Sequence, residues 1–134
     1  MHTLATQYRA AQLYAHRAHN LVSGPTFFAD HTFLGDLYDT YADAYDSLIE
    51  RLIGLGTPPN IITITEAATT AFSKARLDTK PDQFFKSLLN MEYGFQRQIK
   101  KLVPEASDGT ANLLQGLADE SEARCYKIKQ RIGE

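Results

Sequence analysis

Apolar residues recur along the chain at spacings of three and four, the period of helices that bury one face. The first stripe ends at the Gly24-Pro25 pair, and the second runs from Leu34 to the glycines and prolines of residues 54–59. The first stripe is Leu4, Tyr8, Ala11, Ala15, Ala18 and Val22, and the second is Leu34, Tyr38, Tyr41, Tyr45, Leu48, Leu52 and Leu55. The pattern predicts two long helices, the second uninterrupted although Gly35 lies inside it.

A short helix is predicted after the second stripe. Thr63 and Glu66 have the spacing of a capping box, and the Ala- and Thr-rich segment that follows reaches about Ala75. This segment is too short for a main element of a bundle. Residues 60–64, taken alone, are also compatible with a short extended stretch.

Two further long helices are predicted in the second half of the chain. Thr79 is a plausible cap and Pro81 suits the first turn of one helix, which Pro104 ends. Ser107 caps the next helix. Their stripes are Phe84, Leu88, Met91, Phe95 and Leu102, and Leu114, Ala118, Ser121, Cys125, Ile128 and Ile132. We therefore expect an all-α fold, a four-helix bundle with a short extra helix between the second and third long helices.

Size, charge and cysteine content narrow the class of protein. A chain of 134 residues fits one domain, which we expect to span residues 1–134. The net charge is −2 and Arg9 is the only Lys or Arg between Met1 and Tyr14, so we expect little or no DNA binding. The single Cys125 favours a reducing, cytoplasmic setting. No segment is apolar enough to cross a bilayer, and we expect no membrane partner.

Histidines and acids suggest a metal site. His19 and His31 flank a turn-forming segment, and Asp46 and Glu50 follow on the second predicted helix. Imidazoles together with carboxylates suit first-row metals such as iron. Along a continuous helix His31 and Asp46 lie roughly 22 Å apart, so they cannot bind one ion within a single chain. A shared site therefore requires a second copy that runs antiparallel across a two-fold axis.

The acids of the second helix form a strip roughly 60° wide, made up of Asp39, Asp43, Asp46 and Glu50. Like charges at these spacings repel one another, so a positive group should face them. A metal ion or a basic residue of a partner would do this. The structural alternative is neutralisation by Arg9, Arg17 or Arg51. A di-iron centre inside one bundle is disfavoured, because no histidine follows a glutamate by three residues.

At these positions the chain resembles the Dps-type mini-ferritins, the DNA-binding proteins from starved cells within the ferritin-like superfamily. The resemblance depends on four motifs and on the Leu37-Tyr38 pair, and it covers nearly the whole chain, the short extra helix included. The motifs are His19-x5-Pro25, Phe27-Phe28-x-x-His31, Asp46-x-x-x-Glu50-Arg51 and Asp108-Gly-Thr-Ala-Asn-Leu-Leu114.

The resemblance implies a hollow homo-oligomer of twelve subunits built from two-fold dimers. In such a shell, iron(II) is bound between subunits, oxidised by hydrogen peroxide or dioxygen, and stored as iron(III), which protects against oxidative damage. The implied activity is that of a ferroxidase. The implied catalytic and metal-binding residues are His19 and His31 of one subunit with Asp46 and Glu50 of its neighbour, and His16 and Asp43 are auxiliary candidates.

The chain departs from the family in ways that keep a second interpretation open. The family has an aspartate four residues after the second histidine, where this chain has Gly35. Water could fill the vacancy, His16 could swing in, or the site could bind iron more weakly. Tyr14, Tyr38 and Tyr45 are candidate oxidisable groups in a chain without tryptophan. The lysine-rich arm of many members is missing. The alternative is a cage-forming or DNA-associated structural protein with weakened or lost ferroxidase activity.

Overall fold

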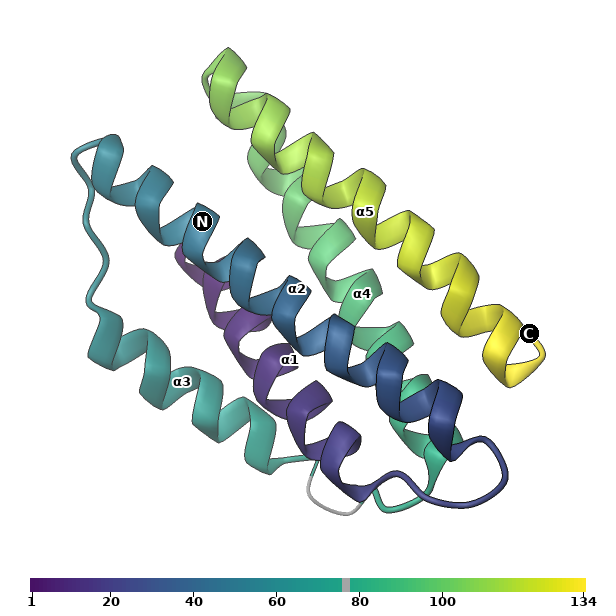
Figure 1. Cartoon of the computed structure of the whole chain (residues 1–134). Helices are drawn as coiled ribbons and strands as arrows, with labels where there is room; N and C mark the ends of the chain where they lie inside the picture. The colour runs from purple at the N-terminus through teal and green to yellow at the C-terminus, as the bar shows by residue number, and fades with distance from the viewer. Residues whose placement is uncertain (76–77) are drawn as a thin grey trace.

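The structure is a computed structural model that describes residues 1–75 and 78–134, and the described residues contain helices and no strand (Figure 1). The long helices are α1 (His2–Leu21), α2 (Phe27–Gly54), α4 (Pro81–Leu102) and α5 (Asp108–Ile132). The short helix α3 (Ile61–Ser73) lies between α2 and α4 in sequence, and a 3-10 turn, η1 (Val103–Glu105), precedes α5. The expected all-α bundle with one short extra helix is confirmed.

The four long helices run up and down, with one crossover. In Figure 1, α1 and α5 run in one direction and α2 and α4 in the other, so α2 and α4 are parallel. Two consecutive long helices that run parallel need a long connection, and α3 forms part of it on the outside of the bundle, packed against α1. Helix α1 also packs against α2 and α4, whereas α5 packs against α4.

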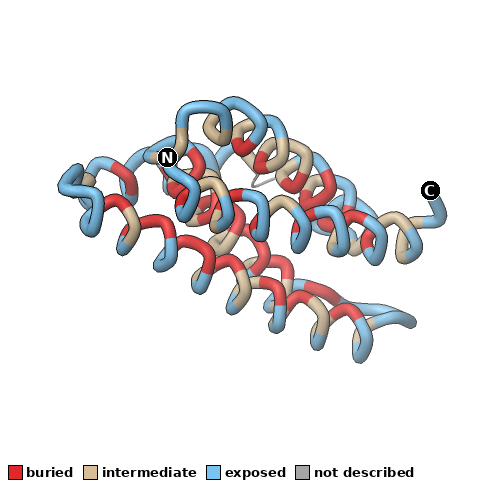
Figure 2. Tube along the Cα trace, turned by 90° about the horizontal axis from the view of Figure 1, so that it is seen from above, coloured by how far each residue is buried: buried red, intermediate tan, exposed pale blue. Residues whose placement is uncertain are grey.

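Each long helix turns its apolar stripe inward, as the buried positions of Figure 2 show. Aromatic rings fill the centre of the bundle: Tyr8 stacks on Phe95 with ring centroids 4.0 Å apart, and Tyr41 meets Phe95 edge-on at 5.6 Å. Burial of such large rings supplies much of the hydrophobic free energy of folding. The predicted stripes of α1 and α2 are buried or partly buried except for Leu55, which lies beyond the last turn of α2 and is 51% exposed.

Two predicted helix starts are wrong in detail, because other side chains satisfy the free backbone N–H groups. Helix α3 begins two residues before Thr63, since the side chain of Asn60 accepts a 3.1 Å hydrogen bond from the Thr63 N–H. Residues 61–64 are helical and do not form an extended stretch. Thr79 is not the cap of α4: the Gln83 side chain accepts from the N–H groups of Thr79 and Lys80.

The start of α5 is as predicted, with the Ser107 hydroxyl accepting from the Thr110 N–H at 3.4 Å. Within residues 1–75 and 78–134, none of the helices is both long and apolar enough to cross a membrane.

Candidate metal centre

The end of α1 and the start of α2 bring His19 and His31 into direct contact. The turn between the helices passes through Gly24, whose φ of +93° is a conformation that glycine adopts without strain. The two imidazole rings stack with centroids 3.8 Å apart and planes 19° apart. The structure therefore brings together the two predicted histidines, twelve positions apart in sequence.

Reciprocal hydrogen bonds hold this pair of rings. His19 Nδ1 lies 2.7 Å from the carbonyl oxygen of His31, and His31 Nδ1 lies 2.9 Å from the carbonyl oxygen of His19. A carbonyl oxygen can only accept, so both Nδ1 atoms carry the proton and donate. In the neutral rings, each Nε2 then keeps its lone pair, and within the described part of the chain neither Nε2 has a hydrogen-bond partner. This is the arrangement that prepares an imidazole to bind a metal.

Other aromatic rings extend the pair into a column of five. Phe27 stacks on His31 at 4.9 Å, Tyr38 meets His19 edge-on at 5.4 Å, and His16 stacks on Tyr38 at 4.3 Å. Of the three candidate oxidisable tyrosines, Tyr38 is thus the one beside the histidines.

The other two tyrosines are engaged elsewhere. Tyr14 donates to Asp78 at 2.6 Å, and the ring of Tyr45 lies 4.2 Å below the guanidinium of Arg9. Burial and the hydrogen bond to Asp78 raise the pKa of Tyr14. The auxiliary candidate His16 is exposed, with its ring centroid 6.4 Å from that of His19.

Gly35 lies against the His19 ring. A Cβ atom added at Gly35 would lie 3.1 Å from Cε1 and 3.2 Å from Nδ1 of His19. These distances are shorter than ordinary van der Waals contacts, so a side chain at position 35 would require the His19 ring to shift by a few tenths of an ångström.

The predicted acids lie away from the histidines within one chain. Helix α2 is continuous from Phe27 to Gly54, so the axial separation of roughly 22 Å between His31 and Asp46 holds. All four acids of the strip, Asp39, Asp43, Asp46 and Glu50, are exposed. Within the described residues, no three His, Cys, Asp or Glu side chains come close enough together to hold an ion.

The three arginines predicted as structural partners of the acidic strip bind other groups. Arg9 donates to Gln12, Arg51 lies 3.5 Å from the Thr110 hydroxyl, and Arg17 donates to the backbone carbonyl of Asp78. None of the ion pairs in the described ranges involves an acid of the strip. Among the described residues, the acids of the strip are therefore exposed and take part in no ion pair.

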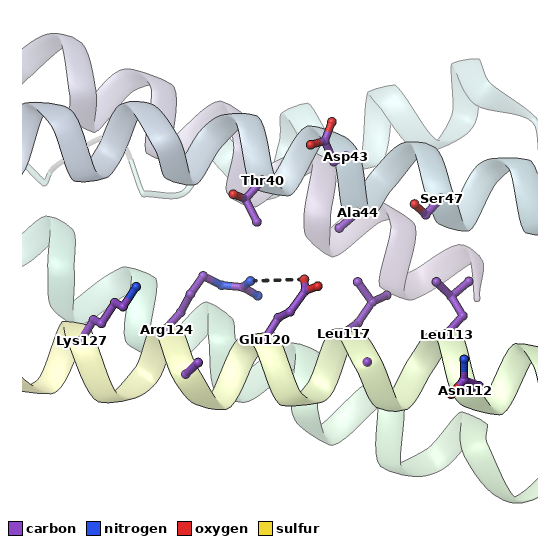
Figure 3. Close-up of a pocket in the computed structure, with 12 residues that line it drawn as sticks. Thr40, Asp43, Ala44, Ser47, Asn112, Leu113, Leu117, Glu120, Arg124 and Lys127 are labelled. Carbon is purple, nitrogen blue, oxygen red and sulfur yellow. Dashed lines mark ion pairs between the residues drawn. The ribbon is translucent and has the colours of Figure 1, made fainter.

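The auxiliary candidate Asp43 lines a groove of about 700 Å³ between α2 and α5. Figure 3 shows Asp43 on one wall of this groove and Glu120 on the other, with Arg124 paired to Glu120 at 3.9 Å. The structure thus places Asp43 on the α2 side of a groove that faces α5, and not beside His19 and His31.

Sequence analysis missed a polar cluster in the centre of the bundle, formed by Glu92, Arg124, Tyr41 and Ser121. Glu92 is fully buried, and its carboxylate accepts hydrogen bonds from Tyr41 and Ser121, both at 2.6 Å. Arg124 binds both carboxylate oxygens, through Nε and through Nη2, the latter at 3.1 Å. Burial and the charge of Glu92 raise the pKa of Tyr41 well above its ordinary value, so this phenol remains a donor.

Glu92 also corrects the predicted stripe of α4. Leu88, Glu92, Phe95 and Ile99 are buried at spacings of four, three and four, whereas the predicted Met91 and Leu102 are partly buried. The signal was present in this spacing, but a glutamate on a helix is usually exposed.

A second polar cluster lies beside His31. Asp30, which is 2% exposed, accepts hydrogen bonds from Arg131 Nε at 2.8 Å, Arg131 Nη2 at 2.9 Å and the Thr26 hydroxyl at 2.7 Å. Burial opposes the ionisation of Asp30, but these hydrogen bonds and the Arg131 charge outweigh it and hold the pKa of the Asp30 carboxyl below its ordinary value. Asp82, 70% exposed, also accepts from Arg131.

Comparison with known proteins identifies the family to which the chain belongs. Residues 1–134 match the ferritin family, described as a ferritin-like domain. The chain is 28% identical over 114 residues to the DNA protection during starvation protein of Helicobacter pylori. The aligned region covers 84% of this chain and 78% of the relative.

Solved structures with the same fold include two Dps proteins from Listeria. A zinc-soaked structure of Dps from Listeria innocua has a TM-score of 0.80 at 19% identity, covering 100% of this chain and 97% of that one. The structure of Dps from Listeria monocytogenes has a TM-score of 0.79 at 17% identity, covering 99% and 92%. The resemblance to Dps-type mini-ferritins is thereby confirmed, and the chain belongs to the ferritin-like domain family.

Proposed function

We propose that this protein is a mini-ferritin of the cytoplasm that oxidises iron(II) between subunits and stores iron(III) inside a homo-oligomeric cage. The observation that carries the proposal is the His19–His31 pair, whose Nδ1 atoms are occupied and whose Nε2 atoms are available. Iron(II) is the substrate, bound by these two imidazoles and by Asp46 and Glu50 of a neighbouring copy.

The register of α2 supports this sharing of ligands. His31 and Asp46 are fifteen residues apart, which turns the helix by about 60° beyond four full turns, so both side chains face broadly the same side. Glu50 lies about 40° further round. Two antiparallel copies of α2 that meet on this side would bring the histidines of each copy to the acids of the other, producing two equivalent sites.

The redox chemistry belongs to iron and the oxidant. Two iron(II) ions each give up one electron, and hydrogen peroxide accepts both together with two protons to form two water molecules. The chain supplies oriented imidazoles and carboxylates, and its exposed acids create a negative potential that concentrates cations. Consumption of peroxide and iron(II) together would protect against oxidative damage.

The Helicobacter relative is described as protecting DNA, and this activity is a separate question for the present chain. The net charge of −2 gives no general attraction for a phosphate backbone. We therefore place protection in the iron chemistry and propose little or no direct DNA binding. Salt-sensitive retardation of duplex DNA at neutral pH would contradict this part of the proposal.

Mixing two inactive variants tests whether the ligands are shared. One variant carries His19→Ala and His31→Ala, and the other carries Asp46→Ala and Glu50→Ala. Each alone is expected to lose accelerated oxidation of anaerobic iron(II) by added peroxide. In a mixed dimer one of the two sites contains only native ligands, so random co-assembly should restore about a quarter of the wild-type sites.

The matched control replaces Asp39, an acid of the same strip that is not a predicted ligand, and Asp39→Ala should oxidise iron(II) at close to the wild-type rate. Native mass measurement of each mixture verifies that subunits have exchanged. Recovery of no activity in exchanged mixtures would refute the intersubunit site. Wild-type protein that fails to accelerate oxidation would favour the alternative of a structural cage protein.

A further inference from the structure

We propose that Gly35 is a positioning residue that holds the His19 imidazole in its metal-binding orientation, and that this position is not simply a lost ligand. The inference rests on the proposed iron function, because it explains how this chain prepares His19 without an acid at position 35. It concerns the residue at which the chain departs from its relatives.

The reason for a glycine lies in the acceptor that His19 uses. His19 Nδ1 donates to the carbonyl oxygen of His31 at 2.7 Å. In an α-helix that carbonyl also accepts from the N–H of residue 35. A side chain that reaches it from α1 must therefore pass over residue 35, which explains why the ring edge formed by Nδ1 and Cε1 lies 3.1 to 3.2 Å from a Cβ built there.

The ring has little freedom to retreat from such an atom. His31 stacks on His19 at 3.8 Å, and Tyr38 meets it edge-on at 5.4 Å. A methyl group at position 35 would push the ring away from the His31 carbonyl and weaken the bond that keeps the proton on Nδ1. The tautomer with the proton on Nε2, which cannot bind a metal through that atom, would then gain population.

A side chain at position 35 and the present hydrogen bond of His19 therefore compete for the same space. Introducing aspartate by Gly35→Asp would add a carboxylate, but its Cβ would meet the His19 ring first. We expect Gly35→Asp and Gly35→Ala both to bind a divalent cation more weakly than the wild type. Loss of a group that orients a metal-binding histidine typically weakens binding by about 10- to 100-fold.

The test uses Co²⁺ under anaerobic conditions as a spectroscopic probe and compares the wild type with Gly35→Ala, Gly35→Asp and Gly116→Ala. Gly116 is a matched control, since it lies in α5 and a Cβ there meets nothing within 4 Å. Titration gives the Co²⁺ affinity. Solid-state ¹⁵N spectra of the metal-free protein labelled at histidine report the tautomer of His19, assigned by comparison with His19→Gln.

We expect weaker Co²⁺ binding and a loss of the Nδ1-protonated His19 signal in both Gly35 variants, with Gly116→Ala unchanged. Tighter binding by Gly35→Asp than by the wild type would overturn the inference and identify a missing ligand. Gly35→Ala matching Gly116→Ala in both measurements would also overturn it. If the wild type binds no Co²⁺ but the spectra change as expected, the metal proposal fails while the positioning of His19 by Gly35 stands.

Discussion

The central polar cluster around Glu92 and the polar groups on the outside of α2 differ in how completely one chain satisfies them. The Glu92 carboxylate is fully buried and is bound by Arg124, Tyr41 and Ser121. Asp46 and Glu50 are exposed and lack an ion pair within the described residues, and the Nε2 atoms of the histidine pair have no hydrogen-bond partner there.

The difference separates structure from function. A buried charge whose hydrogen bonds are all made within the chain has no capacity left for a ligand, so its removal should affect folding. Side-chain atoms that are available to a metal and have no partner within the chain contribute little to the stability of the fold, and their removal should affect metal binding. Four predictions test this division, in order of decreasing effect.

The largest effect is expected for Glu92→Ala. Removal of the carboxylate leaves Arg124 buried without its main partner, which should lower the free energy of unfolding by about 3–5 kcal/mol. Chemical denaturation at one fixed protomer concentration measures this change. The control is Glu120→Ala, because Glu120 pairs with the same arginine but is 60% exposed, and its effect should stay below about 1 kcal/mol. Equal effects of the two variants would show that burial does not distinguish them.

Metal binding at the predicted ligands is expected to stabilise the folded protein. Zn²⁺, which is redox-inert and accepts nitrogen and oxygen ligands, should raise the apparent free energy of unfolding by about 2.7 kcal/mol at a hundred times its Kd. Thermal or chemical denaturation with and without Zn²⁺, followed by chelation, measures the shift. Asp46→Ala should abolish the shift and Asp39→Ala should keep it; the reverse pattern would place the metal elsewhere on the strip.

The Asp30–Arg131 pair lies between the two extremes, because its acid is buried and its arginine is partly exposed. Asp30→Asn should lower the free energy of unfolding at neutral pH by about 2 kcal/mol through loss of charged hydrogen bonds. Because the pKa of Asp30 is lower in the folded chain, this contribution is fully present above the unfolded pKa of about 3.9 and is lost as the pH falls through the folded value.

Denaturation curves of the wild type and Asp30→Asn between neutral and acidic pH should therefore converge in acid. Asp82→Asn removes the exposed partner of the same arginine and should change stability by less than about 1 kcal/mol at every pH. A difference between wild type and Asp30→Asn that grows on acidification would contradict the sign of the shift.

The smallest effect is expected for Asp46→Ala without metal. Removal of one of four like charges relieves repulsion along α2, and alanine favours the helix, so the free energy of unfolding should rise by a few tenths of a kcal/mol. The same denaturation assay detects this. A decrease in the free energy of unfolding of more than about 1 kcal/mol would mean that Asp46 stabilises the fold and would contradict its assignment to metal binding alone.

The sequence predicted the helices well because they depend on local patterns. The buried stripes of α1 and α2 follow from the spacing of apolar residues, and the start of α5 follows from the side chain of Ser107. The caps of α3 and α4 were predicted wrongly, because Asn60 caps α3 three residues before Thr63, and at α4 the Gln83 side chain accepts from the N–H groups of Thr79 and Lys80.

Contacts between distant segments were predicted less completely. The proximity of His19 and His31 could be expected from the turn, but their crossed hydrogen bonds and the close approach of Gly35 depend on how α1 lies on α2. The spacing of Glu92 in α4 is that of a buried position, but its burial also requires the charge of Arg124, which lies 32 residues later on another helix and which no local pattern in α4 identifies.

The packing of α1 has a consequence for how the bundle opens. Helix α1 packs against α2, α3 and α4, whereas α5 packs against α4 and reaches α2 through side chains such as Arg131, so detachment of α1 disrupts more helix contacts than detachment of α5. Amide hydrogens of α5 should accordingly exchange with deuterium through a partial opening that leaves α1 protected, and the last amides to exchange should be those of α1. The N-terminal helix would then form the most slowly exchanging unit of the protein.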